Sequence, residues 1–176
     1  MNLKRFYSGK RVLVTGHTGF KGAWLSLILS ELGAKVYGIS LKPEDTRGNF
    51  YNIINLNKKI KSNYINIVDY KKLAKSIEQI KPEIIFHLAA QPYVIRSYKN
   101  PLETIQSNIL GVSNLLDICR NIKTLKFFLN VTTDKCYEND DNKKAFKETD
   151  NLGGKDIYSS SKACSEILTK SFYESF

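Results

Sequence analysis

Residues 11–22 read RVLVTGHTGFKG, and this stretch decides the fold of the chain. Its first five residues form a short apolar strand, and glycines then recur at every third position, Gly16, Gly19 and Gly22, before an apolar helical run. A strand, a glycine turn and a helix in this order gather free backbone N–H groups at the positive end of a helix dipole, which favours a bound diphosphate. We expect Gly16 to make the turn, Gly19 to admit the ligand closely and Gly22 to let the helix pack. An ordinary strand–turn–helix with incidental glycines is the alternative.

Strand and helix patterns alternate along the rest of the chain. Residues 70–80 form an amphipathic pattern that Asp69 can cap and Pro82 ends, and residues 102–121 repeat apolar side chains at helical spacing. A polar loop with a short helix is expected between residues 43 and 61. Further strands are predicted at 35–40, 63–67, 83–88 and 125–131. This alternation predicts an α/β fold, a doubly wound parallel-sheet Rossmann domain over residues 1–176.

The carboxyl ends of the strands form the expected ligand-binding edge of such a sheet. The second strand ends in Ser40 and Leu41, where a dinucleotide fold commonly has an acidic residue for the ribose, and the nearest acids are Glu44 and Asp45. The choice between NAD and NADP therefore stays open. The residues expected to bind the cofactor are Gly16, Thr18, Gly19, Phe20, Lys21, Ser40, Asn66, Ile67, Leu88, Ala89, Ala90 and Asn108, together with the pair described below.

The bulk composition argues against several classes of protein. The net charge is +10, but the lysines are spread along the chain without an arginine-rich or aromatic-interleaved tract, which indicates a solvated surface rather than a nucleic-acid site. No apolar run approaches the ~18 residues of a membrane span. The first ten residues lack the apolar core of a signal peptide, so a cytoplasmic protein without a membrane partner is expected. Three scattered cysteines and two histidines predict neither a disulfide framework nor a metal site.

Tyr158 and Lys162 lie four residues apart at the start of a last helical pattern, with Asp156 as its cap. This spacing places both side chains on one helix face. A phenol with an ordinary pKa near ~10 is a poor base at neutral pH, and a neighbouring ammonium favours its phenolate. Tyr158 is therefore the candidate general base for an alcohol, and Lys162 can also hold a nicotinamide ribose. A surface pair without a function is the alternative.

The glycine turn, the stretch HLAA at residues 87–90, Asn108 and the Tyr158–Lys162 pair resemble the extended short-chain dehydrogenase/reductase family, which comprises NAD-dependent epimerases and dehydratases. Four stretches are most similar to the nucleotide-sugar 4,6-dehydratases that act on CDP-glucose. In the sister dTDP-glucose dehydratases the position of Lys135 resembles Glu, so this lysine separates the two groups. The four stretches are VTGHTGFKG (14–22), AAQP (89–92), TTDKCYEN (132–139) and YSSSK (158–162).

The resemblance implies NAD as the cofactor and a dehydration of the nucleotide sugar without net redox change. Tyr158 would take the proton of the sugar 4-hydroxyl while hydride passes from C4 to NAD, water would leave across C5 and C6, and the hydride would return to C6. Thr133 would hydrogen-bond the 4-oxygen and Asp134 would protonate the departing hydroxyl. Lys135 lies where the sister group has its C5 base. The implied catalytic residues are thus Thr133, Asp134, Lys135, Tyr158 and Lys162.

By the same resemblance, the helices near 102–121 and 157–175 would pair with their copies in a homodimer; otherwise they only cover the sheet. Members of this family continue for about as many residues again. These 176 residues are therefore expected to lack the last strands and the substrate domain, and to turn over weakly or not at all. A nucleotide-sugar epimerase or reductase half and a non-catalytic NAD-binding fragment are the alternatives. Asp134 and Lys135 argue against an epimerase, in which an elimination acid would have no task.

Overall fold

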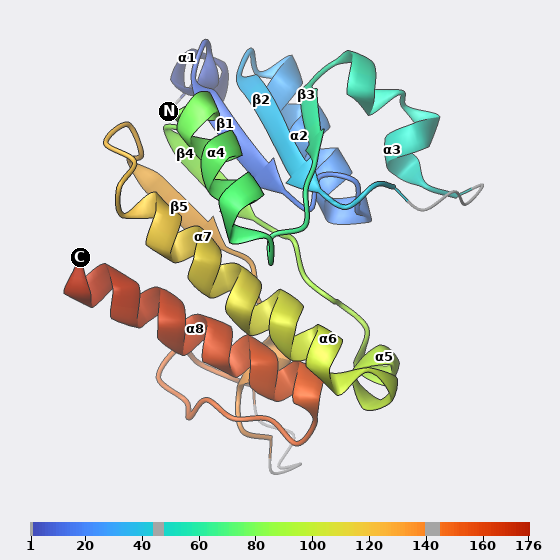
Figure 1. Ribbon diagram of the computed structural model, residues 1–176, viewed down its shortest axis with the longest axis vertical. Helices are drawn as coiled ribbons and strands as arrows, with labels where there is room; N and C mark the ends of the chain where they lie inside the picture. The colour runs from blue at the N-terminus through green and yellow to red at the C-terminus, as the bar shows by residue number, and fades with distance from the viewer. Residues whose placement is uncertain (1, 44–47, 140–144) are drawn as a thin grey trace.

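A five-stranded parallel sheet forms the centre of the computed structural model, which describes residues 2–43, 48–139 and 145–176 (Figure 1). The strands lie in the order β3-β2-β1-β4-β5, and every neighbouring pair is parallel. Successive strands are therefore added on one side of β1 up to β3 and on its other side from β4 onward. The strand order reverses between β1 and β4, and doubly wound folds bind their ligands at this switch point. The strands are β1 (Arg11–Thr15), β2 (Lys35–Ser40), β3 (Lys61–Tyr64), β4 (Ile84–His87) and β5 (Phe127–Asn130).

Helices cover both faces of the sheet, as Figure 1 shows. One face packs against α2 (Phe20–Glu31), α3 (Phe50–Ile53) and η1 (Leu56–Lys58). The other face packs against α4 (Tyr70–Ile80) and α7 (Gly111–Cys119). The remaining helical segments are α1 (Leu3–Tyr7), α5 (Val94–Lys99), α6 (Pro101–Ile105), the π-helical η2 (Gln106–Leu110), η3 (Asp134–Cys136) and α8 (Ile157–Ser175).

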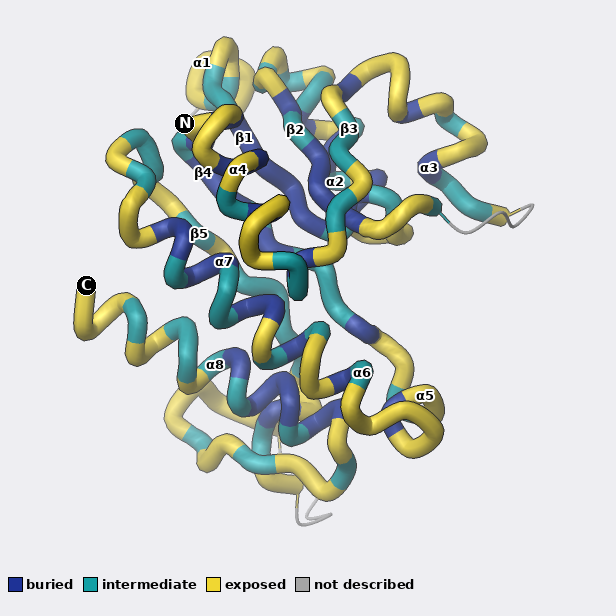
Figure 2. Tube along the Cα trace, viewed as in Figure 1, coloured by how far each residue is buried: buried dark blue, intermediate teal, exposed yellow. Residues whose placement is uncertain are grey.

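Alternate side chains of the central strand supply the two halves of the core, as the two-residue period of a strand requires. Leu13 packs in one cluster with Leu73 of α4 and Leu115 of α7, whereas Val12 and Val14 pack in the other with residues of α2. All three β1 side chains have no exposed surface. The buried part of the trace accordingly runs along the central strands in Figure 2. This double-sided burial holds the carboxyl ends of β1 and β4 in a fixed relative position.

Most of the predicted elements are confirmed. The first two strands fall at Arg11–Thr15 and Lys35–Ser40, and the helix Tyr70–Ile80 begins at its predicted cap, where Asp69 Oδ1 accepts the N–H of Lys72 at 3.2 Å. The last helix is capped by Asp156, whose Oδ1 accepts the N–H of Ser159 at 3.0 Å. The predicted α/β fold with a doubly wound parallel sheet is therefore confirmed.

The third strand is displaced from its predicted position. It runs from Lys61 to Tyr64 rather than over 63–67, because its register with β2 starts at Tyr37 and ends where β2 ends, at Ser40. Asn66 and Ile67 therefore lie in the loop beyond the strand. Ile67 is buried, and the Nδ2 of Asn114 donates to its carbonyl at 3.1 Å.

The long helix predicted over 102–121 is one run of three segments, because a π-helical turn over Gln106–Leu110 separates α6 from α7. The helix begins with Pro101 in its first turn, a position where proline is tolerated. Two short helices, α1 and α5, were not predicted, because five or six residues are too few for a clear helical period.

Two further features bear on the class of protein. Within residues 2–43, 48–139 and 145–176, no helix combines the length and the apolar character that crossing a bilayer requires. In the same part of the chain, no three His, Cys, Asp or Glu side chains gather so that they could hold a metal ion.

Candidate active and cofactor site

The glycine turn after β1 has the backbone geometry that its sequence predicts. Gly16 has a φ of +74°, and a Cβ at this position would lie 2.7 Å from the backbone nitrogen of Ala89. A Cβ at Gly22 would lie 2.1 Å from the carbonyl oxygen of Gly16, so only glycine lets the first turn of α2 approach the loop. Protein packing therefore explains two of the three glycines.

Gly19 has a different explanation. Its φ of −78° is available to any residue, and a Cβ there would meet only the Gly16 carbonyl oxygen, at 3.4 Å. Among residues 2–43, 48–139 and 145–176, nothing requires a glycine at this exposed position, which is the N-cap of the 12-residue helix α2. Free N–H groups and a missing side chain at a helix N-terminus are the conditions that a diphosphate needs, so the turn fits a dinucleotide.

His17, inside the same turn, anchors the loop to the sheet. Its ring is fully buried and packs edge-on against Tyr51, with 5.4 Å between ring centroids. The ring also fills the space beside Gly38 of β2, where a Cβ would come within 2.3 Å of it. The turn is thereby fixed by apolar and aromatic contacts on its inner side, and its outer side is left for a ligand.

Thr15 joins the ends of β1 and β4. Its Oγ1 accepts the backbone N–H groups of Leu88 and Ala89, each at 3.2 Å, and lies 2.6 Å from Nδ1 of the buried His87. Leu88, Ala89 and the following Ala90 are each half-buried. The predicted cofactor-binding residues after β4 thus lie directly beside the glycine turn.

At the end of β2, Ser40 uses its hydroxyl within the protein. The Ser40 hydroxyl donates to the carbonyl of Leu41 at 2.8 Å and lies 3.0 Å from the Thr18 hydroxyl. Thr18 and Ser40 are therefore brought together, and this contact fixes the glycine turn relative to β2. The neighbouring Glu44 and Asp45 lie outside the described residues.

Tyr158 and Lys162 occupy the first two turns of α8, next to the exit of β5. Both side chains are buried, with 9% and 6% of their surface exposed. The ammonium of Lys162 donates to the carbonyl of Val131, the residue after β5, at 3.1 Å. The pair is therefore buried in the interior rather than exposed on the surface, and its catalytic role stays a prediction.

The charges around Lys162 connect it to the glycine turn. Burial lowers the pKa of Lys162 to about 8, the negative charge of Glu166 opposes that shift, and the positive charge of Lys21 adds to it. Lys21 lies in the first turn of α2, two residues after Gly19. The glycine turn follows β1 and Val131 follows β5, and these parallel strands end at the same edge of the sheet, so the turn and the Lys162 ammonium lie along one edge.

The chain's own groups make Tyr158 a weaker acid than an ordinary tyrosine. Burial is the largest cause and raises the pKa of the phenol, the charges of Asp134 and Asp156 raise it further, and a hydrogen bond with Thr133 lowers it. In the protein without a cofactor, desolvation of the phenolate is therefore the dominant effect on Tyr158, and the expected effect of the Lys162 charge on this pKa stays a prediction.

Two of the three predicted residues after β5, Thr133 and Asp134, line an open cavity of about 660 Å³, whereas Lys135 is not among its lining residues. Thr133 caps η3, and its hydroxyl donates to Asp134 Oδ1 at 3.1 Å. Asp134 and Lys135 are exposed, whereas Cys136 is buried behind them. A cavity of this size is in the range of small-molecule sites. The cavity is lined by Thr132, Thr133, Asp134, Cys136, Tyr137, Ala145, Phe146, Lys147 and Glu148.

Asn108, in the π-helical turn, connects the loop after β4 to the start of α8. Its Oδ1 accepts the N–H of Gln91 at 2.8 Å, and its Nδ2 donates to the Gln91 carbonyl at 3.1 Å and to the Ser161 hydroxyl at 2.9 Å. The Ser161 hydroxyl in turn donates to the carbonyl of Tyr158 at 2.7 Å. Asn108 thus supports the Tyr158 turn through its neighbours. π-Helical turns are frequent at functional sites.

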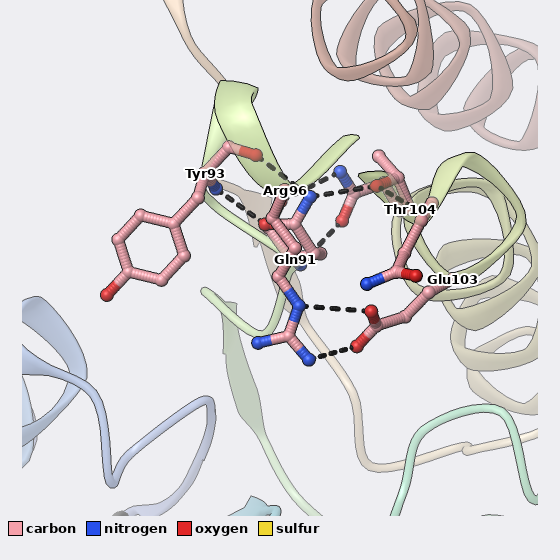
Figure 3. A network of polar contacts seen from close by, with 7 residues as sticks. Gln91, Tyr93, Arg96, Glu103 and Thr104 are labelled. Atoms are coloured by element: carbon pink, nitrogen blue, oxygen red, sulfur yellow. Dashed lines mark hydrogen bonds and ion pairs between the residues drawn. The ribbon is translucent and has the colours of Figure 1, made fainter. Parts of the chain in front are cut away.

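The side chain of Gln91 continues this network on the other side (Figure 3). Its Oε1 accepts the N–H of Tyr93 at 2.6 Å, and its Nε2 donates to the Tyr93 carbonyl at 3.1 Å and to the Thr104 hydroxyl at 2.8 Å. Figure 3 also shows the two-pronged contact of Arg96 with Glu103 across α5 and α6, at 3.0 and 2.5 Å. The loop after β4 is therefore held in one conformation beside the site.

Several residues of this site were not predicted from the sequence. Of these, only Glu166 had a usable local signal, because it follows Lys162 by four residues and so lies on the same helix face. The others contact partners that are distant in sequence, so no spacing rule could find them. They are Thr15, His87, Gln91, Thr132 and Ser161.

The two buried histidines make the stability of this region pH-dependent. Burial lowers the pKa of His17 to about 4 and that of His87 to about 3, from 6.5. The folded state therefore binds these protons less tightly than the unfolded state, so the contribution is complete above pH 6.5 and is lost as the pH falls toward 4. Each histidine should cost about 1.4 kcal/mol per pH unit in that window.

We therefore expect urea unfolding to give a free energy about 4 kcal/mol lower at pH 5 than at pH 7. The substitution His17→Gln should remove about half of that difference, because one of the two depressed groups is gone. Equal unfolding free energies at both pH values would contradict the buried, neutral state of these rings.

Comparison with known proteins agrees with this geometry. The family model described as GDP-mannose 4,6 dehydratase matches residues 13–176. The chain is 45% identical over 173 residues to a CDP-glucose 4,6-dehydratase from Salmonella typhimurium, and the match covers 98% of this chain and 48% of that protein.

Solved structures share the fold. An epimerase from Methanothermobacter thermautotrophicus superimposes with a TM-score of 0.86 at 26% identity, covering 99% of this chain and 51% of the other. A UDP-glucuronic acid 4-epimerase from Bacillus cereus, solved in complex with UDP-glucuronic acid and NAD, gives a TM-score of 0.80 at 26% identity, covering 94% and 52%. The chain spans about half the length of each of these proteins.

Proposed function

The chain belongs to the GDP-mannose 4,6-dehydratase family, and we propose that it is the NAD-binding part of a nucleotide-sugar 4,6-dehydratase that converts CDP-glucose to CDP-4-keto-6-deoxyglucose. The observation that carries this proposal is that the glycine turn after β1 and the Tyr158–Lys162 pair, which is bonded to Val131 after β5, lie along the same carboxyl edge of the parallel sheet. A dinucleotide on the turn would extend toward the only phenol–ammonium pair that the motifs single out.

The residues around the turn fit NAD. The N-terminus of α2 and the open position at Gly19 would take the diphosphate, Ser40 and Thr18 lie where the adenosine side would be, and Lys162 would hold the nicotinamide ribose. When bound, NAD supplies an acceptor for the hydride from C4 of the sugar and a donor that returns it to C6. Asn66, Ile67 and residues 88–90 would form the remaining walls.

Tyr158 is the group that we assign to proton removal from the sugar 4-hydroxyl. Its pKa is above the ordinary value in the protein alone, so the buried phenol would keep its proton until a substrate and a positive charge arrive. Thr133, whose hydrogen bond lowers that pKa, would bond the same 4-oxygen. Lys162 stabilises the phenolate through its positive charge.

Asp134 and Lys135 are assigned to the elimination of water. Once C4 carries a ketone, the neighbouring C5–H is acidified, and a base at C5 together with an acid at the C6 hydroxyl removes water across this bond. Asp134 faces the cavity after β5 and would be the acid, and Lys135 follows it at the position of the C5 base. Both side chains are exposed, and Asp134 lines the cavity itself, so a substrate there could reach it; Lys135 would have to turn toward the cavity to act.

An epimerase is the second candidate, because the two solved structures named above are epimerases. The 45% identity to a CDP-glucose 4,6-dehydratase and the presence of Asp134 favour the dehydratase. A third candidate, a fragment that binds NAD without turnover, follows from the length of the relatives. We also propose that two copies of this chain form a dimer through α6–α7 and α8, where Leu102, Leu110 and Ile167 are exposed. The molecular mass measured in solution tests this proposal.

Calorimetric titration with NAD and with NADP tests the proposal first. We expect NAD to bind, Lys162→Met to weaken binding at least about tenfold, and Tyr158→Phe to leave affinity within about threefold, because the phenol acts on the sugar rather than on the dinucleotide. A chain that binds neither dinucleotide would contradict the cofactor assignment.

Turnover of CDP-, dTDP-, UDP- and GDP-glucose, followed by mass spectrometry for loss of water and by ¹H NMR for the configuration at C4, distinguishes the remaining candidates. Loss of one water from CDP-glucose identifies the dehydratase, a sugar of unchanged mass but inverted C4 identifies an epimerase, and no product from any of them identifies a binding fragment. Tyr158→Phe should lower any turnover by at least about 100-fold.

A further inference from the structure

Three consecutive residues at the exit of β5 are joined to α8 by hydrogen bonds. The Nδ2 of Asn130 donates to the hydroxyls of Ser165 and Thr169 at 2.8 and 2.9 Å. The carbonyl of Val131 accepts from the Lys162 ammonium, and the hydroxyl of Thr132 donates to Oε1 of Glu166. The side chains that α8 directs at this strand end are therefore held in a fixed register.

Glu166 is the charged residue among these contacts between the end of β5 and α8, and the proposed reaction gives it no role. It follows Lys162 by one helical turn, so the two side chains share a face of α8. Its carboxylate is half-buried, and its orientation is set by Thr132 from a different element. A carboxylate held by a neighbour in this way cannot rotate freely toward water.

We propose that Glu166 is a positioning residue for Lys162: oriented by Thr132, its negative charge keeps the buried ammonium protonated beside the Tyr158 turn. This role deepens the proposed function and rests on it, because Lys162 needs its charge only if it serves the phenol and the cofactor. Glu166 acts through Lys162 and is not assigned any contact with the substrate.

The surroundings of Lys162 lower its pKa, and the charge of Glu166 offsets part of this decrease. Burial and the positive charge of Lys21 on α2 lower the pKa of Lys162, and the buried ring of His87 on β4 itself has its pKa lowered by the Lys162 charge. The charge of Glu166 is the largest influence that raises the pKa of Lys162; the thiol of Cys136 on η3 has its own pKa raised by burial, so it is neutral in this pH range. Removing it should therefore move the Lys162 equilibrium toward the neutral amine near physiological pH.

The test is the titration midpoint of Lys162 itself, measured by NMR from the ¹³Cε shift of ¹³C-lysine-labelled protein without NAD. The Lys162 signal is assigned as the one lost in Lys162→Met. We expect Glu166→Gln, which keeps the side-chain length and an acceptor for Thr132, to lower the midpoint by about one pH unit from about 8. Glu174→Gln, the same charge change about two turns closer to the end of α8, should leave the midpoint unchanged.

The orienting role of Thr132 is tested by a second pair of variants. Thr132→Val should lower the Lys162 midpoint in the same direction as Glu166→Gln, and Thr132→Ser should restore the wild-type value, because serine keeps the hydroxyl. Identical midpoints for Glu166→Gln and Glu174→Gln would overturn the proposal. If Glu166→Gln does not fold, identical midpoints for Thr132→Val and Thr132→Ser would overturn it instead.

The readout separates this inference from the proposed function. Because the titration uses protein without NAD, a failure of dinucleotide binding in calorimetry would leave the midpoints as they are. Conversely, if NAD binds but Glu166→Gln and Thr132→Val leave the Lys162 midpoint unchanged, the cofactor site is retained and Glu166 has no positioning role in it.

Discussion

Replacing Gly22 with alanine is expected to lower the unfolding free energy by about 3 kcal/mol and to abolish measurable NAD binding. The added Cβ would lie 2.1 Å from the Gly16 carbonyl oxygen and 2.9 Å from the Cα of His17. Both are backbone atoms, and the turn that carries them is fixed by the buried ring of His17, so it cannot move aside cheaply. Domains of this size are stable by only about 5–15 kcal/mol, so the loss is a large fraction.

Gly19→Ala is the matched control in the same turn. Its Cβ would make one contact at 3.4 Å, and its φ of −78° suits alanine, so unfolding free energy should stay within about 0.5 kcal/mol of wild type. NAD affinity should nevertheless fall at least about tenfold, because the methyl group would occupy the space against which a diphosphate lies. Urea unfolding and calorimetry measure the two effects separately.

The pair of glycine variants can fail in two informative ways. A Gly22→Ala protein as stable as wild type would show that α2 is not pressed against the turn. A Gly19→Ala protein with unchanged stability and unchanged NAD affinity would show that no ligand approaches that position, and the cofactor assignment would lose its structural basis.

Asn108→Ala should lower the unfolding free energy by about 3 kcal/mol, because it leaves three buried polar groups without their partner. These are the N–H and carbonyl of Gln91 and the hydroxyl of Ser161, which lie 2.8–3.1 Å from the amide of Asn108. Asn108 itself has 1% of its surface exposed, so water cannot easily replace it. Urea unfolding at neutral pH is the measurement.

Asn121→Ala provides the comparison for this substitution. Asn121 lies just beyond α7 and makes one long contact, from its Nδ2 to the Asp117 carbonyl at 3.5 Å, on the exposed surface. Its removal should change the unfolding free energy by less than about 0.5 kcal/mol. Similar losses for the two asparagines would mean that burial of Asn108 is not what makes it important, and the link from the β4 loop to Tyr158 would need another explanation.

The elements predicted best are those whose signals lie within a few residues. The strand Arg11–Thr15 was predicted from its apolar residues. The helix Tyr70–Ile80 was predicted from its apolar period, with Asp69 as the cap and Pro82 beyond its end, because these residues act on the neighbouring backbone. The strand predicted at 63–67 was displaced, because its limits depend on where β2 offers partners rather than on its own residues. The π-helical turn around Asn108 had no local signal of this kind.

The candidate site divides in the same way. The glycine pattern and the Tyr158–Lys162 pair were predicted from their spacing, and the structure places them along the same carboxyl edge of the sheet. The raised pKa of Tyr158 and the lowered pKa of Lys162 could not be predicted from spacing, because burial is their largest cause and burial is a property of the packed chain.

The sequence by itself therefore determined the α/β order of elements, the turn for a diphosphate and the phenol–ammonium pair, because each of these rests on neighbours in the chain. Only the tertiary structure decided which residues support them. Thr15 meets His87 across 72 positions, Asn108 meets Ser161 across 53, and Thr132 meets Glu166 across 34. Such hydrogen bonds exist only once the sheet and helices have packed, since packing alone excludes the water that would otherwise satisfy these groups.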